Sequence, residues 1–269
     1  MNKNQIEKNI LIAIKASLLG GEDILDVYES KFAVEQKDDK SPLTLADKKA
    51  NDTIVKFLEQ TELPVLSEEG KEIPYKERKG WENYWVVDPL DGTKEFVKRN
   101  GEFTVNIALM EGEYPIGGVI FVPVKNQLYF GYEGSKAFFV EPAGSTYTLK
   151  SIKERGVKLP IKQKRKTYNI VGSRSHMSPE TETFIEEQKK KHKSIDIVSM
   201  GSSLKICLVA DGTADVYPRF APTMEWDTAA GQAIAEAAGK SVINYETGKR
   251  LNYNKENLLN SWFLVGPKV

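Results

Sequence analysis

The feature that most constrains the fold is a change in the spacing of apolar residues along the chain. Between residues 103 and 140, short apolar runs are separated by turn-forming residues such as Glu111-Gly112-Glu113, a pattern typical of an antiparallel meander. Beyond residue 168, short apolar runs alternate with stretches of helical spacing, which is typical of layered α/β proteins. The sequence therefore predicts an α+β first part and an α/β second part.

Individual elements follow from the same spacing. Apolar residues recur at helical intervals between Ile6 and Leu18, and a second helix is predicted to begin near Ser41-Pro42, where proline suits the first turn. The apolar run 84–87 predicts a strand that ends at Asp88-Pro89. Residues 141–167 are polar and rich in lysine, and we expect a connector or a surface excursion there. The elements predicted beyond it are strands at 168–172, 195–199, 215–217, 241–245 and 261–265, and helices beginning near Pro179, Ser202 and Asp227.

Composition argues against several classes of protein. The 269 residues carry 38 Lys+Arg and 38 Asp+Glu, and a net charge of zero argues against a surface that binds a nucleic-acid polymer, although it leaves room for a local basic pocket. The single cysteine, Cys207, forms neither an internal disulfide nor a cysteine-based zinc site, which favours a reducing compartment. Since the chain has two histidines in all, we expect any metal ligands to be carboxylates.

The N-terminal segment lacks the features of a targeting or membrane-spanning sequence. Its apolar run, 10–14, is flanked closely by Glu7 and Lys15, so no apolar stretch of about 20 residues is formed. We therefore expect a cytoplasmic protein with no transmembrane segment. The sequence does not decide whether it associates peripherally with the inner membrane.

Two aspartates directly follow the predicted strand 84–87. Asp88 and Asp91 are three residues apart with Pro89 between them, so both carboxylates, together with the carbonyl oxygen of Leu90, can converge on one cation. Mg²⁺ prefers such an all-oxygen set of ligands and usually keeps waters or a substrate phosphate as the remaining ones. The alternative is a capped turn, because Asp and Gly are favoured turn residues.

Three further acidic positions are ambiguous when each is taken alone. Asp47 shares a predicted helical face with apolar residues, where an unpaired carboxylate is costly, but the segment 44–47 also resembles a capping box. Glu68-Glu69 follows a short strand-like run and is equally typical of a solvated loop. Asp227 begins a helix and shares its face with apolar residues, and a simple N-cap is the alternative there.

Considered together, these acids favour a metal-dependent phosphoryl-transfer site. Four of them lie at the ends of predicted elements, namely Glu68, Asp88, Asp91 and Asp227. A two-metal site for phosphoryl transfer needs a ring of acids of this kind. Next to them, Gly92-Thr93 opens a short predicted helix, 94–98, whose free N–H groups suit a phosphate.

Two of these segments also resemble the signature motifs of a known family. Asp88-Pro89-Leu90-Asp91-Gly92-Thr93-Lys94-Glu95-Phe96 and Trp226-Asp227-Thr228-Ala229-Ala230-Gly231 resemble the two motifs of the inositol-monophosphatase-like, lithium-sensitive magnesium phosphatases. Other segments resemble one branch, the bacterial CysQ-type 3′(2′),5′-bisphosphate nucleotidases, namely 41–47, 66–69, 92–109, 173–176, 201–205 and 217–220. The resemblance covers nearly the whole chain and is weakest over residues 141–167.

The resemblance implies a fold, a metal set and a catalytic group. The implied fold is the layered αβαβα sandwich, with an N-terminal α+β domain (1–150) that carries the main metal site and a C-terminal α/β domain (151–269) that completes the metal and nucleotide site. Two or three Mg²⁺ ions would be held by Glu68, Asp88, the carbonyl of Leu90, Asp91 and Asp227. The implied catalytic residues are Asp47, Thr93 and Glu68, of which Asp47 and Thr93 would orient and deprotonate the attacking water.

The implied reaction removes the 3′-phosphate of adenosine 3′,5′-bisphosphate to give AMP and phosphate, a clearance step in sulfate assimilation, and could extend to 3′-phosphoadenosine 5′-phosphosulfate. Lys205 and Arg219 are natural partners for a phosphate of the nucleotide, since arginine can bind a phosphate through two hydrogen bonds. The substrate-binding residues implied in this way are Glu68, Leu90, Asp91, Gly92, Thr93, His176, Ser202, Lys205, Arg219 and Asp227.

Two other functions are left open by the sequence. An inositol monophosphatase or a fructose-1,6-bisphosphatase would use the same metal site, and the orientation of Lys205 and Arg219 distinguishes them, because a monophosphate needs no second anionic subsite. A non-catalytic nucleotide-binding protein would be favoured by a broken motif, whereas every predicted metal position is intact. The preferred bisphosphate, the number of metal ions and the oligomeric state are not determined by the sequence.

Overall fold

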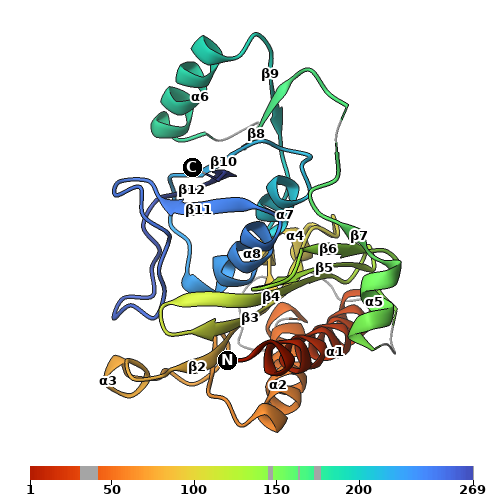
Figure 1. The fold of residues 1–269 in the computed structure, drawn as a ribbon. Helices are drawn as coiled ribbons and strands as arrows, with labels where there is room; N and C mark the ends of the chain where they lie inside the picture. Colours follow the sequence, from red (N-terminus) through yellow and green to blue (C-terminus); the bar gives the residue numbers. More distant parts are fainter. Residues whose placement is uncertain (31–41, 145–147, 163, 173–176, 269) are drawn as a thin grey trace.

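A computed structural model describes residues 1–30, 42–144, 148–162, 164–172 and 177–268 of the protein. Within these residues the chain forms five layers, in which two sheets alternate with helices (Figure 1). This is the αβαβα sandwich predicted from the sequence motifs. The predicted substrate-binding residue His176 lies outside the described residues, together with the rest of the segment 173–176.

The first layer consists of α1 (Lys3–Tyr28) and α2 (Pro42–Leu58), which pack against each other and against one face of the larger sheet. Both helices contribute to a single apolar cluster with the inward side chains of that sheet. Apolar burial of this kind is the main stabilising contribution to the fold, at roughly 25 cal/mol per Å² of apolar surface removed from water. The two helices therefore hold the sheet from below in the view of Figure 1.

The second layer is a seven-stranded sheet whose strands lie side by side in sequence order. Its first pair, β1 and β2, is parallel and the remaining neighbours are antiparallel, which confirms the predicted meander. The strands are β1 (Val65–Ser67), β2 (Asn83–Asp91), β3 (Thr104–Glu111), β4 (Tyr114–Val122), β5 (Gln127–Tyr132), β6 (Phe138–Val140) and β7 (Val157–Lys158). Among the short helical segments, η1 (Glu59–Thr61) precedes β1, α3 (Tyr75–Arg78) connects β1 to β2, and α4 (Thr93–Val97) connects β2 to β3.

Strand β2 continues through Asp88-Pro89, so the prediction that the strand ends there was wrong. Asp88 pairs with Asn106 of β3 and Asp91 pairs with Thr104, so three steps on β2 correspond to two on β3. The extra residue forms a bulge, which is where a strand accommodates a proline that cannot donate a hydrogen bond to its neighbour. The bulge keeps both aspartates on the strand itself.

The third layer contains α7 (Leu204–Ala210) and α8 (Glu225–Ala237), which lie between the two sheets (Figure 1). Helix α8 packs across β2, β3, β4 and β5. It approaches β4 so closely that a Cβ atom at Gly118 would lie 2.2 Å from the carbonyl oxygen of Ala230, which only glycine allows. Both helices begin close to the predicted positions, at Leu204 and at Glu225.

The second sheet and one further helix complete the sandwich. Strands β8 (Tyr168–Val171) and β9 (Ile195–Val198) are parallel, and β10 (Tyr217–Arg219), β12 (Phe263–Pro267) and β11 (Lys240–Asn244) form an antiparallel group. A bridge between Ile170 and Val216 joins the two groups. Helix α6 (Pro179–Lys191) covers the outer face by packing Phe184 and Ile185 on this bridge. The predicted alternation of strands and helices is confirmed, although much of the sheet is antiparallel.

The segment 141–167 is more than the connector that we expected. It contains α5 (Leu149–Arg155), which buries Leu149 and Ile152 in the same apolar cluster as α1, and it contains β7 at the edge of the first sheet. The two apolar residues, three positions apart, supply a helix face that the many lysines obscured. The proposed domain boundary at residue 150 falls inside α5 and stays a prediction.

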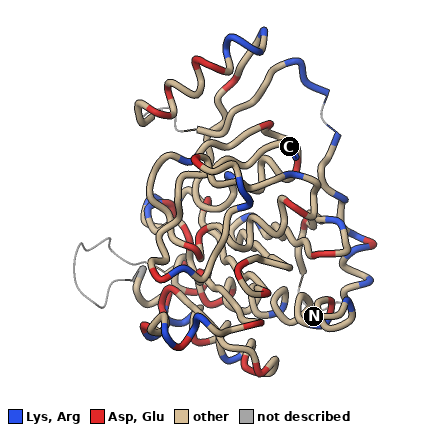
Figure 2. Tube along the Cα trace, turned by 60° about the vertical axis from the view of Figure 1, so that its left-hand side comes forward, with Lys and Arg blue, Asp and Glu red and all other residues tan. Residues whose placement is uncertain are grey.

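Within the described residues, no helix is both long and apolar enough to cross a membrane. Figure 2 shows basic and acidic residues interspersed along both parts of the chain, in keeping with their equal numbers.

Candidate active site

Three carboxylates from three separate elements meet between the first sheet and α8. One ligand atom each from Glu68, Asp88 and Asp227 lies within 4.8 Å of the others. Glu68 directly follows β1 and donates its N–H to the carbonyl of Val87 at 3.1 Å, which fixes it beside β2. Asp88 lies in β2, and Asp227 is in the first turn of α8. Converging carboxylate oxygens are the donor set that Mg²⁺ prefers, so these residues fit a divalent cation.

The electrostatics of the cluster also fit a cation. Burial and repulsion from Asp91 and Glu69 raise the pKa of Glu68 to about 7. Burial and repulsion from Asp91 raise the pKa of Asp227 to about 7, and burial with the same neighbour raises the pKa of Asp88 well above its ordinary value. Acids this close resist simultaneous ionisation unless a positive charge lies between them.

Without a cation, the folded protein should become less stable as the pH rises from about 4 to about 8. The folded-state pKa values of Asp47, Glu68 and Asp227 lie at about 8, 7 and 7, above their ordinary values of 3.8, 4.5 and 3.8. In this window the folded state binds more protons than the unfolded state, so stability falls with rising pH. Melting temperatures measured in chelator should show this slope, and saturating Mg²⁺ should flatten it. A melting temperature in chelator that rises steadily over the same range contradicts the prediction.

Asp227 combines a structural contact with its place in the cluster. Its Oδ2 accepts the N–H of Met224 at 2.8 Å, which caps the first turn of α8. The alternative that Asp227 is the N-cap was wrong, because the N-cap is Met224 and Asp227 accepts the N–H of Met224 from within the first turn of α8. The same carboxylate also lies beside Glu68 and Asp88. A capping hydrogen bond and a cluster position are thus compatible in one residue.

Asp91 ends β2 and turns one carboxylate oxygen toward the second half of the chain. Its Oδ2 accepts hydrogen bonds from the N–H of Ser203 at 2.6 Å, from the hydroxyl of Ser203 at 2.5 Å and from Nδ2 of Asn106 at 3.4 Å. Among the described residues, nothing donates a hydrogen bond to its other oxygen. The protein therefore holds Asp91, a predicted metal ligand, through Oδ2 and leaves Oδ1 without a hydrogen bond from the described residues.

Sequence reasoning missed Asn106 and Ser203, although a signal for the first was present. Strand β3 begins with Thr104-Val105-Asn106-Ile107, in which polar and apolar residues alternate, and all four are buried. Two polar side chains on one face of a fully buried strand need partners, so this spacing predicts a polar network. Ser203 lies in a motif that resembles the family, but nothing in its local sequence marks it apart from Ser202.

Asp47 lies beside the cluster on the buried face of α2. Its side chain is 8% exposed, and burial followed by repulsion from Glu69 and Glu68 raises its pKa to about 8. It also contributes to the raised pKa of Asp88. The capping-box interpretation was wrong, because α2 begins at Pro42 and Asp47 lies in its second turn.

The bulge and the turn after it position Leu90, Gly92 and Thr93. The N–H of Leu90 donates to Oδ1 of Asp88 at 3.1 Å, while the role of its carbonyl stays a prediction. Gly92 has a φ of 103°, a conformation that favours glycine, and it leads into the exposed Thr93 at the start of α4. Helices α2 and α4 are in contact, but no hydrogen bond joins Asp47 to Thr93 among the described side chains, so this catalytic pair stays a prediction.

A cavity of about 160 Å³ adjoins the cluster and contains the predicted cationic residues. Its lining includes Asp91, Gly92 and Asp227 together with Ser202, Lys205 and Arg219. A neighbouring cavity of about 110 Å³ shares Lys205 and Arg219 and extends toward α6. The structure thus brings together the predicted metal-binding and phosphate-binding residues that it describes.

Two polar atoms of this cavity lack partners within the described part of the chain. The hydroxyl of Ser202 and Nε of Arg219 are buried without a hydrogen bond, and Ser202 has a left-handed backbone with a φ of 46°. Lys205 donates to the carbonyl of Ser202 at 3.2 Å, and Arg219 donates to that of Pro222 at 3.1 Å. A buried unpaired polar group costs about 1–3 kcal/mol, so these groups point to a ligand with hydrogen-bonding oxygens.

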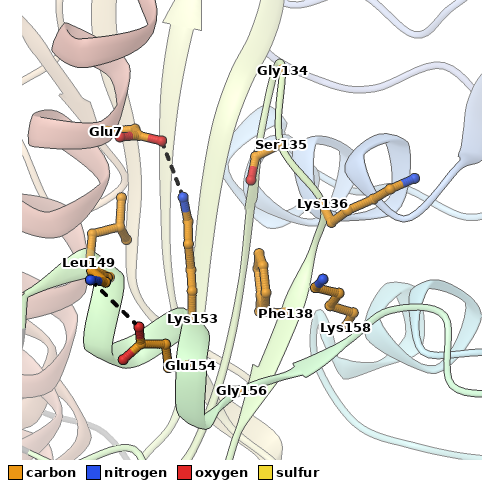
Figure 3. Close-up of a pocket in the computed structure, with 11 residues that line it drawn as sticks. Glu7, Gly134, Ser135, Lys136, Phe138, Leu149, Lys153, Glu154, Gly156 and Lys158 are labelled. Carbon is orange, nitrogen blue, oxygen red and sulfur yellow. Dashed lines mark hydrogen bonds and ion pairs between the residues drawn. The ribbon is translucent and has the colours of Figure 1, made fainter.

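A larger cavity, of about 960 Å³, lies away from the carboxylate cluster and is lined by residues of α1, α5, β6, β7 and the loop 134–136. Figure 3 shows Lys153 extending across it to Glu7, with an Nζ to Oε1 distance of 3.1 Å, beside Phe138. None of the predicted site residues lines this cavity. Size therefore does not identify the functional site, whereas the converging acids do.

Comparison with known proteins agrees with this geometry. The model of the inositol monophosphatase family matches residues 5–264. The chain therefore belongs to the inositol monophosphatase family, and it is an enzyme of the phosphatase class.

Particular relatives in this family are similar over nearly their full length. The chain is 44% identical to the 3′(2′),5′-bisphosphate nucleotidase CysQ of Salmonella typhimurium, over 91% of this chain and 94% of that protein. The crystal structure of CysQ from Bacteroides thetaiotaomicron superposes with a TM-score of 0.93 at 53% identity, covering 98% of each chain. An inositol monophosphatase from Zymomonas mobilis has a TM-score of 0.74 at 20% identity, covering 97% of this chain and 92% of that one, which shows the shared fold alone.

Proposed function

We propose that the protein is a Mg²⁺-dependent phosphatase that removes the 3′-phosphate of adenosine 3′,5′-bisphosphate, giving AMP and inorganic phosphate. The observation that carries this proposal is the cavity whose lining combines the cationic residues Lys205 and Arg219 with the acids Asp91 and Asp227, the second of which belongs to the carboxylate cluster. A bisphosphate has two separate anionic groups, and this arrangement offers a separate place for each. The similarity to proteins named as 3′(2′),5′-bisphosphate nucleotidases supports the same substrate class.

The metal site in this proposal uses residues from both halves of the chain. Glu68, Asp88 and Asp227 would hold the ions together with the carbonyl of Leu90 and the free oxygen of Asp91, and two or three ions are proposed. When bound, the ions would neutralise the phosphate oxygens and make the attacking water more acidic. The raised pKa values of the three clustered acids support this role, because a cation relieves their repulsion.

Asp47 and Thr93 would handle the proton of the attacking water. Asp47 lies next to the cluster without belonging to it, which suits a proton acceptor rather than an ion ligand. A threonine hydroxyl can donate to a carboxylate while it accepts from a water, so Thr93 could orient the water toward the phosphate. The contact between helices α2 and α4 supports this proposed pairing.

The phosphate that is not cleaved would be bound by Ser202, Lys205 and Arg219. The unpaired Ser202 hydroxyl and Arg219 Nε supply donors, and Lys205 supplies charge. A cavity of about 160 Å³ accommodates a small molecule rather than a polymer, so we propose a free nucleotide and no nucleic acid as the substrate. We also propose a cytoplasmic location, since the chain has a single cysteine, the buried Cys207, and so uses no internal disulfide.

Lys205→Ala or Arg219→Ala should raise the KM for adenosine 3′,5′-bisphosphate by roughly 10- to 150-fold. Loss of one charged hydrogen-bonding partner typically costs about 1.5–3 kcal/mol, which corresponds to that factor. Initial rates over a range of substrate concentrations measure the effect. Hydrolysis of inositol 1-phosphate, expected to be slow already, should change little because it lacks the second phosphate.

The matched control is Lys136→Ala, which removes a lysine from the larger, unrelated cavity. We expect its kinetic constants for both substrates to equal those of the unaltered protein. Equal losses on both substrates in the Lys205 and Arg219 variants would show that these residues support the fold or the metal site instead. A preference of the unaltered protein for inositol 1-phosphate or fructose 1,6-bisphosphate would overturn the proposed function itself.

A further inference from the structure

A buried polar network connects Asp91 of the metal site to the loop that precedes α7. Thr104 donates its hydroxyl to Oδ1 of Asn106 at 3.0 Å, which orients the amide so that Nδ2 faces Ser203 at 2.8 Å and Asp91 at 3.4 Å. Thr104, Asn106 and Ser203 are at most 4% exposed. Buried hydrogen bonds of this kind hold a single arrangement, because breaking one leaves a polar group unpaired.

Ser203 is the centre of this network. Its hydroxyl accepts from Asn106 and lies within hydrogen-bond distance of both Oδ2 of Asp91 and, at 2.8 Å, the carbonyl of Asp227. Its N–H also donates to Oδ2 of Asp91 at 2.6 Å. Ser203 therefore contacts two predicted metal ligands. It contacts the side-chain carboxylate of Asp91 and the backbone carbonyl of Asp227.

The loop before α7 also lines the cavity assigned to the second phosphate. Ser202, Ser203 and Lys205 all contribute to this lining, and Ser203 is in addition hydrogen-bonded to Asp91. Ser202 differs from Ser203, because it has a left-handed backbone and its hydroxyl has no hydrogen-bond partner among the described residues. One short loop thus contacts both the proposed phosphate subsite and the metal site.

We infer that Ser203, supported by Asn106, is a positioning residue that fixes one carboxylate oxygen of Asp91 and thereby presents the other oxygen to the cation. Through Ser203, Asp91 is also coupled to the loop before α7, which lines the cavity assigned to the second phosphate. The coupling to the phosphate rests on the proposed function, whereas the positioning of Asp91 does not. Without the network, the carboxylate of Asp91 could rotate away from the neighbouring acids that repel it. By reciprocity of linked equilibria, binding of the second phosphate and of the cation should strengthen each other.

Ser203→Ala tests the inference through metal binding rather than turnover. Residues that orient a metal ligand typically contribute about 10- to 100-fold to metal affinity, so calorimetric titration of the substrate-free protein should give a Mg²⁺ Kd raised by that factor. Asn106→Ala should weaken binding in the same direction. The Mg²⁺ Kd of the double variant should exceed that of the more strongly affected single variant by no more than about threefold, since both residues act through one network.

Ser202→Ala is the matched control in the same loop. It should leave the Mg²⁺ Kd of the substrate-free protein unchanged and raise the KM for adenosine 3′,5′-bisphosphate, whereas Ser203→Ala should mainly raise the Mg²⁺ concentration needed for half-maximal kcat. An unchanged Mg²⁺ Kd in both Ser203→Ala and Asn106→Ala would overturn the inference. The inference would also fail if the variants only lowered the melting temperature in chelator and bound Mg²⁺ normally.

If the unaltered protein binds Mg²⁺ but does not hydrolyse the bisphosphate, the proposed function fails, while the titrations still decide the role of Ser203.

Discussion

Asp88→Asn should abolish measurable turnover at ordinary Mg²⁺ concentrations while leaving the chain folded. Asp88 is 1% exposed and belongs to the carboxylate cluster, so in the proposed site its replacement removes one of the ligands themselves. Residues that only orient a ligand contribute about 10- to 100-fold to metal affinity, and we expect the loss of the ligand to exceed this range. Phosphate release from adenosine 3′,5′-bisphosphate at increasing Mg²⁺ concentrations measures the effect.

The same variant should be at least as stable as the unaltered protein in chelator. The pKa of Asp88 is raised well above its ordinary value by burial and by its acidic neighbours, so at neutral pH a neutral side chain removes repulsion. The amide oxygen can still accept the N–H of Leu90. Addition of Mg²⁺ should raise the melting temperature of the unaltered protein much more than that of the variant. Full activity of the unaltered protein in excess chelator would refute a metal-dependent reaction.

Asp47→Asn should slow the chemical step by at least about a hundredfold without weakening substrate binding, which is the usual scale for loss of a general base. Asp47 is buried beside Glu68 and Asp88 but lies outside the group of converging carboxylates, so its removal should leave the ions in place. Single-turnover kinetics at saturating Mg²⁺, together with a substrate-binding titration, measure the two quantities separately.

Asp52→Asn is the matched control, since Asp52 is an exposed aspartate on the same helix and should be replaceable without effect on rate or binding. The Asp47 variant should also keep or gain stability in chelator, because burial raises the pKa of this carboxyl to about 8. A variant with a normal single-turnover rate would exclude Asp47 as the proton acceptor.

The pattern of apolar residues alone determined much of the architecture. The short apolar runs between residues 103 and 140, separated by turn-forming residues, predicted the meander, because strands buried on both faces have nearly continuous apolar sequences. Helical spacing in the N-terminal segment predicted the packing face of α1, because residues three and four apart lie on one face of a helix. The sequence also predicted that Glu68, Asp88 and Asp227 gather, because all three lie at the ends of predicted elements, and the structure brings their carboxylates together.

The local sequence was misleading where distant contacts override local preference. Asp88-Pro89 is typical of a turn, yet β2 continues through it because β3 pairs on both sides of a bulge. The segment 44–47 has the composition of a capping box, yet the helix begins earlier and Asp47 faces the acids. In both places the burial of long-range partners outweighs a preference of the order of 1 kcal/mol.

The sequence by itself determined which residue types this protein could use, and the tertiary structure alone decided how they are joined. Asp91 and Ser203 are 112 residues apart, and nothing in the residues around either one predicts their hydrogen bonds. Their contact depends on the close packing of α8 on the first sheet, which is set by Gly118 and Ala230 and brings the loop before α7 to the end of β2. Local periodicity reports only which face of an element is buried, whereas hydrogen bonds between elements depend on the distances that packing imposes.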